Sequence, residues 1–113
     1  MSIIKVNAMS EADALAMRRS GASMSRQSFC LALYRAQILN EPDAIAAARG
    51  EWPAALSDLL NDLPAAEAAE ARIVWATSPQ IRRLHPLLAS IAAHMSIDDA
   101  GLDVIFGLNG QEG

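Results

Sequence analysis

The chain is poor in cysteine, poor in aromatic residues and free of long hydrophobic runs. Cys30 is its one cysteine, which excludes an intramolecular disulfide and gives no sign of an oxidising compartment. The least polar later stretch, residues 84–97, is too short to span a membrane. Glu11 and Asp13 interrupt any run near the N-terminus that could serve as a signal-peptide core. We therefore expect a cytoplasmic protein with no membrane partner.

Aromatic residues make up only 4% of the 113 residues, whereas alanine, the best helix former, makes up about a fifth. An alanine-lined core is thin. At about 25 cal/mol per Å² of buried apolar surface, it gives ordinary or marginal stability unless a partner covers more of the surface. The composition predicts a single helical domain and leaves a homo-oligomer open.

The net charge of −4 is unevenly distributed along the chain. Residues 1–40 carry five Lys or Arg against two Asp or Glu, and residues 41–113 carry four against eleven. This pattern argues against nucleic acid as a partner, because phosphate binding requires cations clustered across one face. The alternative hypothesis is a nucleic-acid-associated regulatory module that uses the basic N-terminal region, with an electropositive edge of Arg18, Arg19, Arg26 and Arg35.

Residues 1–24 differ in composition from the rest and are predicted to form an N-terminal arm. Residues 3–6 begin like a short strand, a helix follows over residues 11–19, and residues 20–23 are typical of a flexible segment. The helix has only a weak apolar stripe, so we expect that it needs a neighbouring surface to hold it. The arm is therefore either flexible or ordered by a partner.

Residues 25–108 are predicted to form an all-α domain, a compact bundle of about five to six short helices, with a C-terminal tail over 109–113. Apolar residues at helical spacing, prolines in first turns and glycines at helix ends mark the segments. The expected helices begin at or just after residues 25, 41, 53, 64, 86 and 96. A further helical turn is expected after Pro79, through Arg82 and Arg83.

Three details of this bundle can be predicted. The helix over residues 64–77 should be central and buried on more than half of its circumference, with Trp75 packed in the core. Tyr34 should widen the buried stripe of the first helix of the bundle. Ser96, followed by Asp99, resembles a capping box at the start of the last helix.

Five segments carry a family resemblance: residues 25–27 (SRQ), 40–44 (NEPDA), 71–76 (ARIVWA), 85–88 (HPLL) and 96–106 (SIDDAGLDVIF). In these segments the chain resembles small uncharacterised phage and prophage proteins encoded near tail genes. Those proteins share a helix bearing an Ile-x-Trp pair, a later Pro-Leu helix and a final Asp-rich capped helix. The resemblance lies in helix-packing positions. It implies a non-enzymatic accessory factor that binds a protein partner, such as a phage tail protein, in the cytoplasm or in the virion.

No nucleophile, base and acid occur at a recognisable spacing, and we expect neither enzymatic activity nor a cofactor or metal. His85 and His94 lie nine residues apart and lack the four-residue spacing that places two ligands on one helical face. Cys30 falls on an apolar stripe, so a buried thiol is favoured over a nucleophile activated by Arg26. The chain contains no Gly-x-Ser-x-Gly elbow.

The candidate residues for protein binding are Trp52, Arg82 and Arg83. Trp52 lies in a predicted turn beside Pro53 and has few packing neighbours in sequence, so we expect it to be partly exposed. Arg82 and Arg83 lie in a short polar segment between apolar helices. For this segment both a solvated face and a docking site for an acidic surface stay open.

Overall fold

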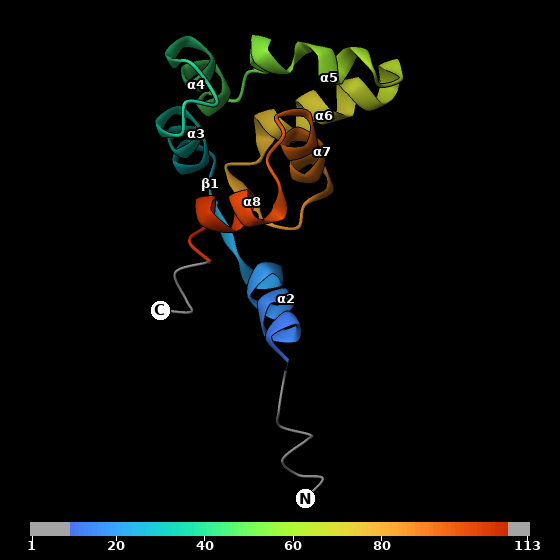
Figure 1. Cartoon of the computed structure of the whole chain (residues 1–113). Coiled ribbons are helices and arrows are strands. Elements are labelled where there is room, and N and C mark those ends of the chain that lie inside the picture. The colour runs from blue at the N-terminus through green and yellow to red at the C-terminus, as the bar shows by residue number, and fades with distance from the viewer. Residues whose placement is uncertain (1–9, 109–113) are drawn as a thin grey trace, which may run out of the picture.

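The computed structural model describes residues 10–108 and shows a mainly helical protein with one small sheet (Figure 1). In chain order the elements are α2 (Glu11–Gly21), β1 (Ser23–Ser25), α3 (Arg26–Arg35), α4 (Glu41–Ala48), the 3₁₀ helix η1 (Ala54–Leu56), α5 (Ser57–Asn61), α6 (Ala65–Thr77), β2 (Gln80–Arg82), α7 (Pro86–His94) and α8 (Asp99–Ile105). A mainly helical fold is thus confirmed, and the sheet corrects the all-α assignment. The strand expected over residues 3–6 and the tail over 109–113 lie outside the described residues.

The sheet joins two segments that are far apart in the sequence. Strand β1 pairs with β2 in antiparallel register, with Met24 opposite the buried Ile81. Beside this ladder, the amide of Arg26 donates to the carbonyl of Pro79 at 2.7 Å. The pairing fixes the end of the N-terminal arm to the body of the molecule.

The prediction of a helical turn after Pro79 is wrong, because Arg82 is the last residue of strand β2. The backbone of Arg83 extends the hydrogen bonding between the two strands by one residue. The amide of Arg83 donates to the carbonyl of Ala22 at 3.0 Å. The segment expected to be flexible, residues 20–23, ends in that same ladder. Strand pairing over such a sequence separation leaves no local signal in either segment.

The hydrophobic core lies between the helices of the body, and Trp75 is part of it. The ring of Trp75 is buried and packs edge to face against Phe29, with ring centroids 6.3 Å apart. Its indole N–H donates to the carbonyl of Ala47 at 3.0 Å. The predicted core position of Trp75 is therefore confirmed.

Helix α6 is not the central helix that we expected, because only one stripe of it is buried. Ala68, Ala71 and Trp75 are buried, whereas Ile73 is 61% exposed. In Figure 1 this helix begins at the edge of the molecule, next to α5, and runs inward beside α7. Alanine occurs on all sides of α6 and is small enough to be tolerated in water, so its positions did not show which side is covered.

The last helix begins later than predicted. Ser96 adopts a positive φ of 61° at the end of α7, where the amide of Ile97 donates to the carbonyl of Ala92 at 2.8 Å. Asp98 is the N-cap of α8, and its carboxylate accepts a hydrogen bond from the amide of Gly101 at 2.8 Å. The capping box expected from Ser96 and Asp99 is therefore wrong, since Ser96 ends the preceding helix.

Candidate protein-binding surface

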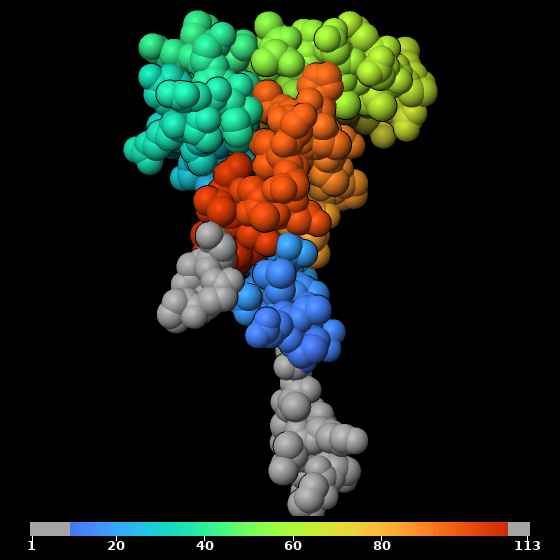
Figure 2. All heavy atoms as spheres, viewed as in Figure 1, coloured from blue at the N-terminus to red at the C-terminus, as the bar shows by residue number. Residues whose placement is uncertain are grey.

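Helices α3 and α4 form a hairpin at one corner of the molecule (Figures 1 and 2). Both helices begin at side-chain caps that the sequence provides. The hydroxyl of Ser25 accepts from the amide of Ser28 at 3.0 Å, and the side chain of Asn40 accepts from the amide of Asp43 at 2.8 Å. The short connection between them turns the chain so that α4 runs back along α3.

A groove of about 410 Å³ lies between the outer faces of these two helices. The residues that line it are mainly apolar, with one acid and one amide at its margin. They are Gln27, Cys30, Leu31 and Tyr34 from α3, and Glu41, Ala44, Ile45 and Ala48 from α4. In the following text, the α3–α4 surface means the exposed side chains of this groove together with Arg49, the residue that ends α4.

Within the described chain, three large exposed apolar side chains gather on the α3–α4 surface, whereas each of the others lies on a segment of its own. Leu31, Tyr34 and Ile45 are all exposed and all line this groove. The other large exposed apolar residues lie one each on α2, on α6, after β2 and on α8: Met17, Ile73, Leu84 and Val104. Single exposed apolar residues are normal on a monomer, whereas a gathered group marks a binding site.

Arg26 fastens the hairpin to the body of the molecule. Its guanidinium donates to the carbonyls of Ala48 at 3.2 Å, Trp75 at 2.6 Å and Ser78 at 3.3 Å. One side chain thereby ties the end of α4 and the end of α6 to the start of α3. These hydrogen bonds hold the two helices of the α3–α4 surface in a defined position on the body of the protein.

Cys30 forms part of the floor of the groove, and the predicted buried thiol is confirmed. Burial raises the pKa of this thiol to about 11, although the positive charge of Arg26 acts in the opposite direction. The thiol is therefore protonated at neutral pH and is a poor nucleophile. It contributes packing to the groove.

Trp52 is partly buried, which confirms its predicted partial exposure. Its indole N–H donates to the carbonyl of Leu56 at 2.8 Å, and its ring packs edge to face against Trp75 with ring centroids 6.4 Å apart. Both the hydrogen bond and the ring contact hold Trp52 on the core. Any partner would meet only part of this ring.

The two predicted arginines occupy different environments. Arg82 ends β2 and is exposed, with the exposed Leu84 close by in the sequence. Arg83 is only 4% exposed, so its side chain is covered by the protein itself. This difference could not be predicted from the sequence, because its cause is a carboxylate on α8, Asp103.

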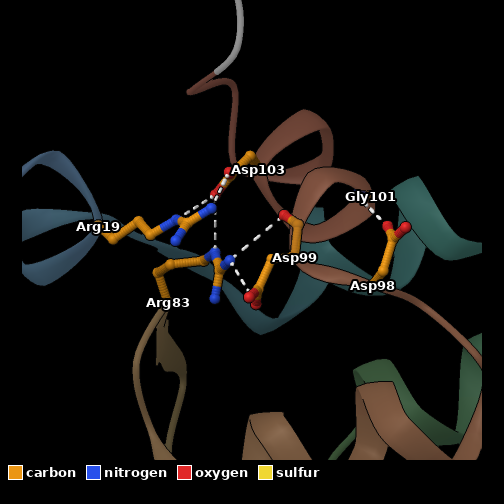
Figure 3. Close-up of polar contacts among 6 residues, drawn as sticks. All are labelled: Arg19, Arg83, Asp98, Asp99, Gly101 and Asp103. Carbon is orange, nitrogen blue, oxygen red and sulfur yellow. Dashed lines mark hydrogen bonds and ion pairs between the residues drawn. The ribbon is translucent and has the colours of Figure 1, made fainter. Parts of the chain in front are cut away.

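Arg83 belongs to a network of ion pairs that links the arm, the sheet and α8 (Figure 3). Its Nε donates to Oδ1 of Asp103 at 3.1 Å, and its Nη2 lies 3.2 Å from Oδ1 of Asp99. Arg19 of α2 donates to both oxygens of Asp103, at 3.0 and 2.6 Å. Two guanidinium groups therefore share one buried carboxylate.

The network shifts the ionisation of its members. The hydrogen bond from Arg19, assisted by Arg83, holds the pKa of Asp103 below its usual value even though burial acts to raise it. The same hydrogen bond to Asp103 raises the pKa of Arg19. Asp103 and Arg19 therefore stay charged at neutral pH.

The arginines of the proposed nucleic-acid edge do not form one free face. Arg19 is paired with Asp103, and Arg26 is bound to three carbonyls inside the fold. Arg18 is half-buried, and Arg35 is exposed at the end of α3. Two of the four cations are therefore already used to hold the structure together.

A second groove, of about 260 Å³, lies between α6 and α7 and includes Glu67, Glu70 and His85. Nδ1 of His85 accepts a hydrogen bond from the amide of Leu87 at 3.0 Å and so caps the start of α7. Over residues 10–108, no three His, Cys, Asp or Glu side chains gather in a way that could hold a metal ion. Among the helices of the same range, none has the length and apolar character needed to cross a membrane.

Comparison of the chain with protein-family models, with curated proteins and with solved structures gives no match. The candidate site therefore rests on the geometry described above. Sequence reasoning missed it because Tyr34 was expected in the buried stripe of α3, which is wrong: Tyr34 is exposed. A signal was present in α4, where Glu41, Ile45 and Arg49 follow one another at four-residue spacing and so share one face.

Proposed function

We propose that this chain is a non-enzymatic protein-interaction factor of phage or prophage origin, and that it binds protein through the α3–α4 surface. The observation that carries the proposal is the gathering of Leu31, Tyr34 and Ile45 over one groove. A helical hairpin that exposes apolar side chains between polar margins is a common way to bind another helix. The resemblance to small proteins encoded near tail genes supports a role as an accessory factor in tail assembly.

On this proposal the protein acts in the cytoplasm of its host, and entry into the virion is the alternative location. Trp52 and Arg82 contribute secondary contacts, because Trp52 is half-buried and Arg82 is exposed beside a single apolar residue. Arg83 contributes indirectly, since it is covered by the protein and holds α8 in place.

The test is capture of partners by the tagged protein after prophage induction, at physiological salt. The informative variants are Ile45→Glu on the α3–α4 surface and Ile73→Glu on α6, where the wild-type side chains are 47% and 61% exposed. Both substitutions place a charge at an exposed apolar position, so their effects on folding should be equally small. Circular dichroism of both variants checks that the fold is kept.

We expect that wild type and Ile73→Glu retain the same proteins, whether untagged copies of this chain or phage proteins, and that Ile45→Glu loses them. Arg82→Glu should weaken capture only slightly. Equal capture by Ile45→Glu and Ile73→Glu would contradict the proposed binding surface. Capture that persists in Ile45→Glu but is lost in Arg82→Glu would assign binding to the end of β2 instead.

A further inference from the structure

One exposed stripe of α4 carries opposite charges at its two ends and an apolar residue at its centre. Glu41, Ile45 and Arg49 are all exposed and lie four residues apart, so they follow one another along the same face of the helix. At about 1.5 Å of rise per residue, each charge lies about 6 Å along the axis from Ile45. The two charges are thus placed symmetrically about the apolar centre.

The charge pattern of this stripe is complementary to the same pattern on a second helix that runs in the opposite direction. If a second α4 lies antiparallel to the first about a two-fold axis at Ile45, then Glu41 of each copy meets Arg49 of the other. The apolar centres meet each other at the axis, as an isologous interface requires. The antiparallel arrangement also pairs the positive end of each helix dipole with the negative end of the other.

The neighbouring side chains are compatible with this arrangement. Leu31 and Tyr34 of α3 are exposed, line the same groove as Ile45 and extend the apolar area from α4 onto α3. Arg49 is paired within its own chain with Glu51, at 3.1 Å, but both side chains are more than half exposed. Such a surface pair contributes little, so Arg49 can turn to a second acid at small cost.

We propose that a second copy of this chain covers the α3–α4 surface, with the two α4 helices antiparallel about a two-fold axis close to Ile45. The two hairpins then form a four-helix interface. This inference rests on the proposed function, since it names the partner of the same surface. The buried thiol of Cys30 takes no part, so the dimer is non-covalent.

The experiment is sedimentation equilibrium of the full chain over a wide range of concentration, with charge reversals at the two ends of the stripe. One chain has a mass of 12.0 kDa. At high concentration, the wild-type protein should reach twice this mass. Glu41→Arg places two arginines together at both ends of the interface, and Arg49→Glu places two glutamates together. Each reversal should raise the dissociation constant of the dimer at least about tenfold.

Mixing the two variants is the decisive step. A chain with Glu41→Arg presents two arginines and a chain with Arg49→Glu presents two glutamates, so the mixture should form a heterodimer at concentrations at which each variant alone dimerises more weakly than wild type. The double variant Glu41→Arg/Arg49→Glu should dimerise with itself again. Both substitutions oppose the dipole of α4, so a dimer restored in the double variant cannot come from a more stable helix.

A wild-type protein that stays monomeric at every concentration would overturn the inference, as would charge reversals that leave the dimer unchanged or a mixture that does not associate. The results that contradict the proposed function differ from the results that contradict only this inference. If the protein is monomeric and its capture of a phage protein depends on Ile45, the surface binds a different partner and only the inference is wrong. If neither self-association nor capture depends on Ile45, both are wrong.

Discussion

Nε of Arg83 lies 3.1 Å from Oδ1 of Asp103, and both side chains are buried. Arg83 follows β2 and Asp103 belongs to α8, so this pair joins the sheet to the last helix. Arg19 adds the arm to the same carboxylate through two hydrogen bonds. A carboxylate that serves two cations from different elements is hard to replace, because its loss leaves both of them without their main partner.

Asp103→Asn should destabilise the protein strongly, because it leaves the buried charge of Arg83 without its carboxylate. We expect the free energy of unfolding to fall by about 3 kcal/mol, measured by urea denaturation. Glu51→Gln is the matched control, since it removes a carboxylate from an exposed pair with Arg49 and should change stability by less than about 1 kcal/mol. Equal losses in the two variants would contradict a structural role for the buried pair.

The stability of the protein should depend on pH through Asp103. The pKa of Asp103 is lower in the folded protein than in the unfolded chain, chiefly because of the hydrogen bond from Arg19. The stabilisation is therefore complete above the unfolded pKa of about 4 and is lost as the pH falls through the folded value. Urea denaturation from neutral to acid pH should show the difference between wild type and Asp103→Asn shrinking below about pH 4. A difference that stays constant over this range would contradict the lowered pKa.

Arg19 should control how firmly α2 is held to the body. None of the residues of α2 is buried, and the helix projects from the base of the molecule (Figure 2). Arg19→Ala should therefore increase hydrogen exchange across residues 11–21 while exchange in α3 and α7 stays the same. Arg19→Lys keeps the charge but cannot form two parallel hydrogen bonds, so it should give an intermediate result. Unchanged exchange in Arg19→Ala would show that β1 alone holds the arm.

Gly50 and Gly107 offer a matched pair for a packing prediction. Both have a positive φ, 95° and 75°, so alanine is strained at either position. A Cβ at Gly50 would lie 3.2 Å from the carbonyl oxygen of Ala76, whereas a Cβ at Gly107 would have nothing within 4 Å. We expect Gly107→Ala to cost about 1 kcal/mol and Gly50→Ala clearly more, both by urea denaturation. The reverse order would contradict the close approach of α6 to the end of α4.

Local features of this fold could be predicted from the sequence, whereas its long-range features could not. The helix after Ser25, the helix after Asn40 and the core position of Trp75 follow from caps and apolar spacing. The pairing of β1 with β2 and the burial of Arg83 depend on partners distant in the sequence.

The candidate surface was missed for a different physical reason. A helical hairpin has apolar residues on more than one side, and the sequence does not show which side the rest of the protein covers. Tyr34 looked like a core residue because it lies near Leu33 and Cys30, which are buried. Only the fold shows that the body covers one face of α3 and leaves Leu31 and Tyr34 outside.

The central claim is that the α3–α4 surface meets its own copy at Ile45, and a disulfide introduced there tests it most directly. Ile45→Cys places a thiol at the proposed axis, and Cys30 stays unreactive because it is buried with its pKa raised to about 11. In a glutathione redox buffer, we expect Ile45→Cys to form a covalent dimer while Ile73→Cys, at the more exposed position on α6, stays monomeric. Equal cross-linking at the two positions, or no cross-linking at residue 45, would contradict the account.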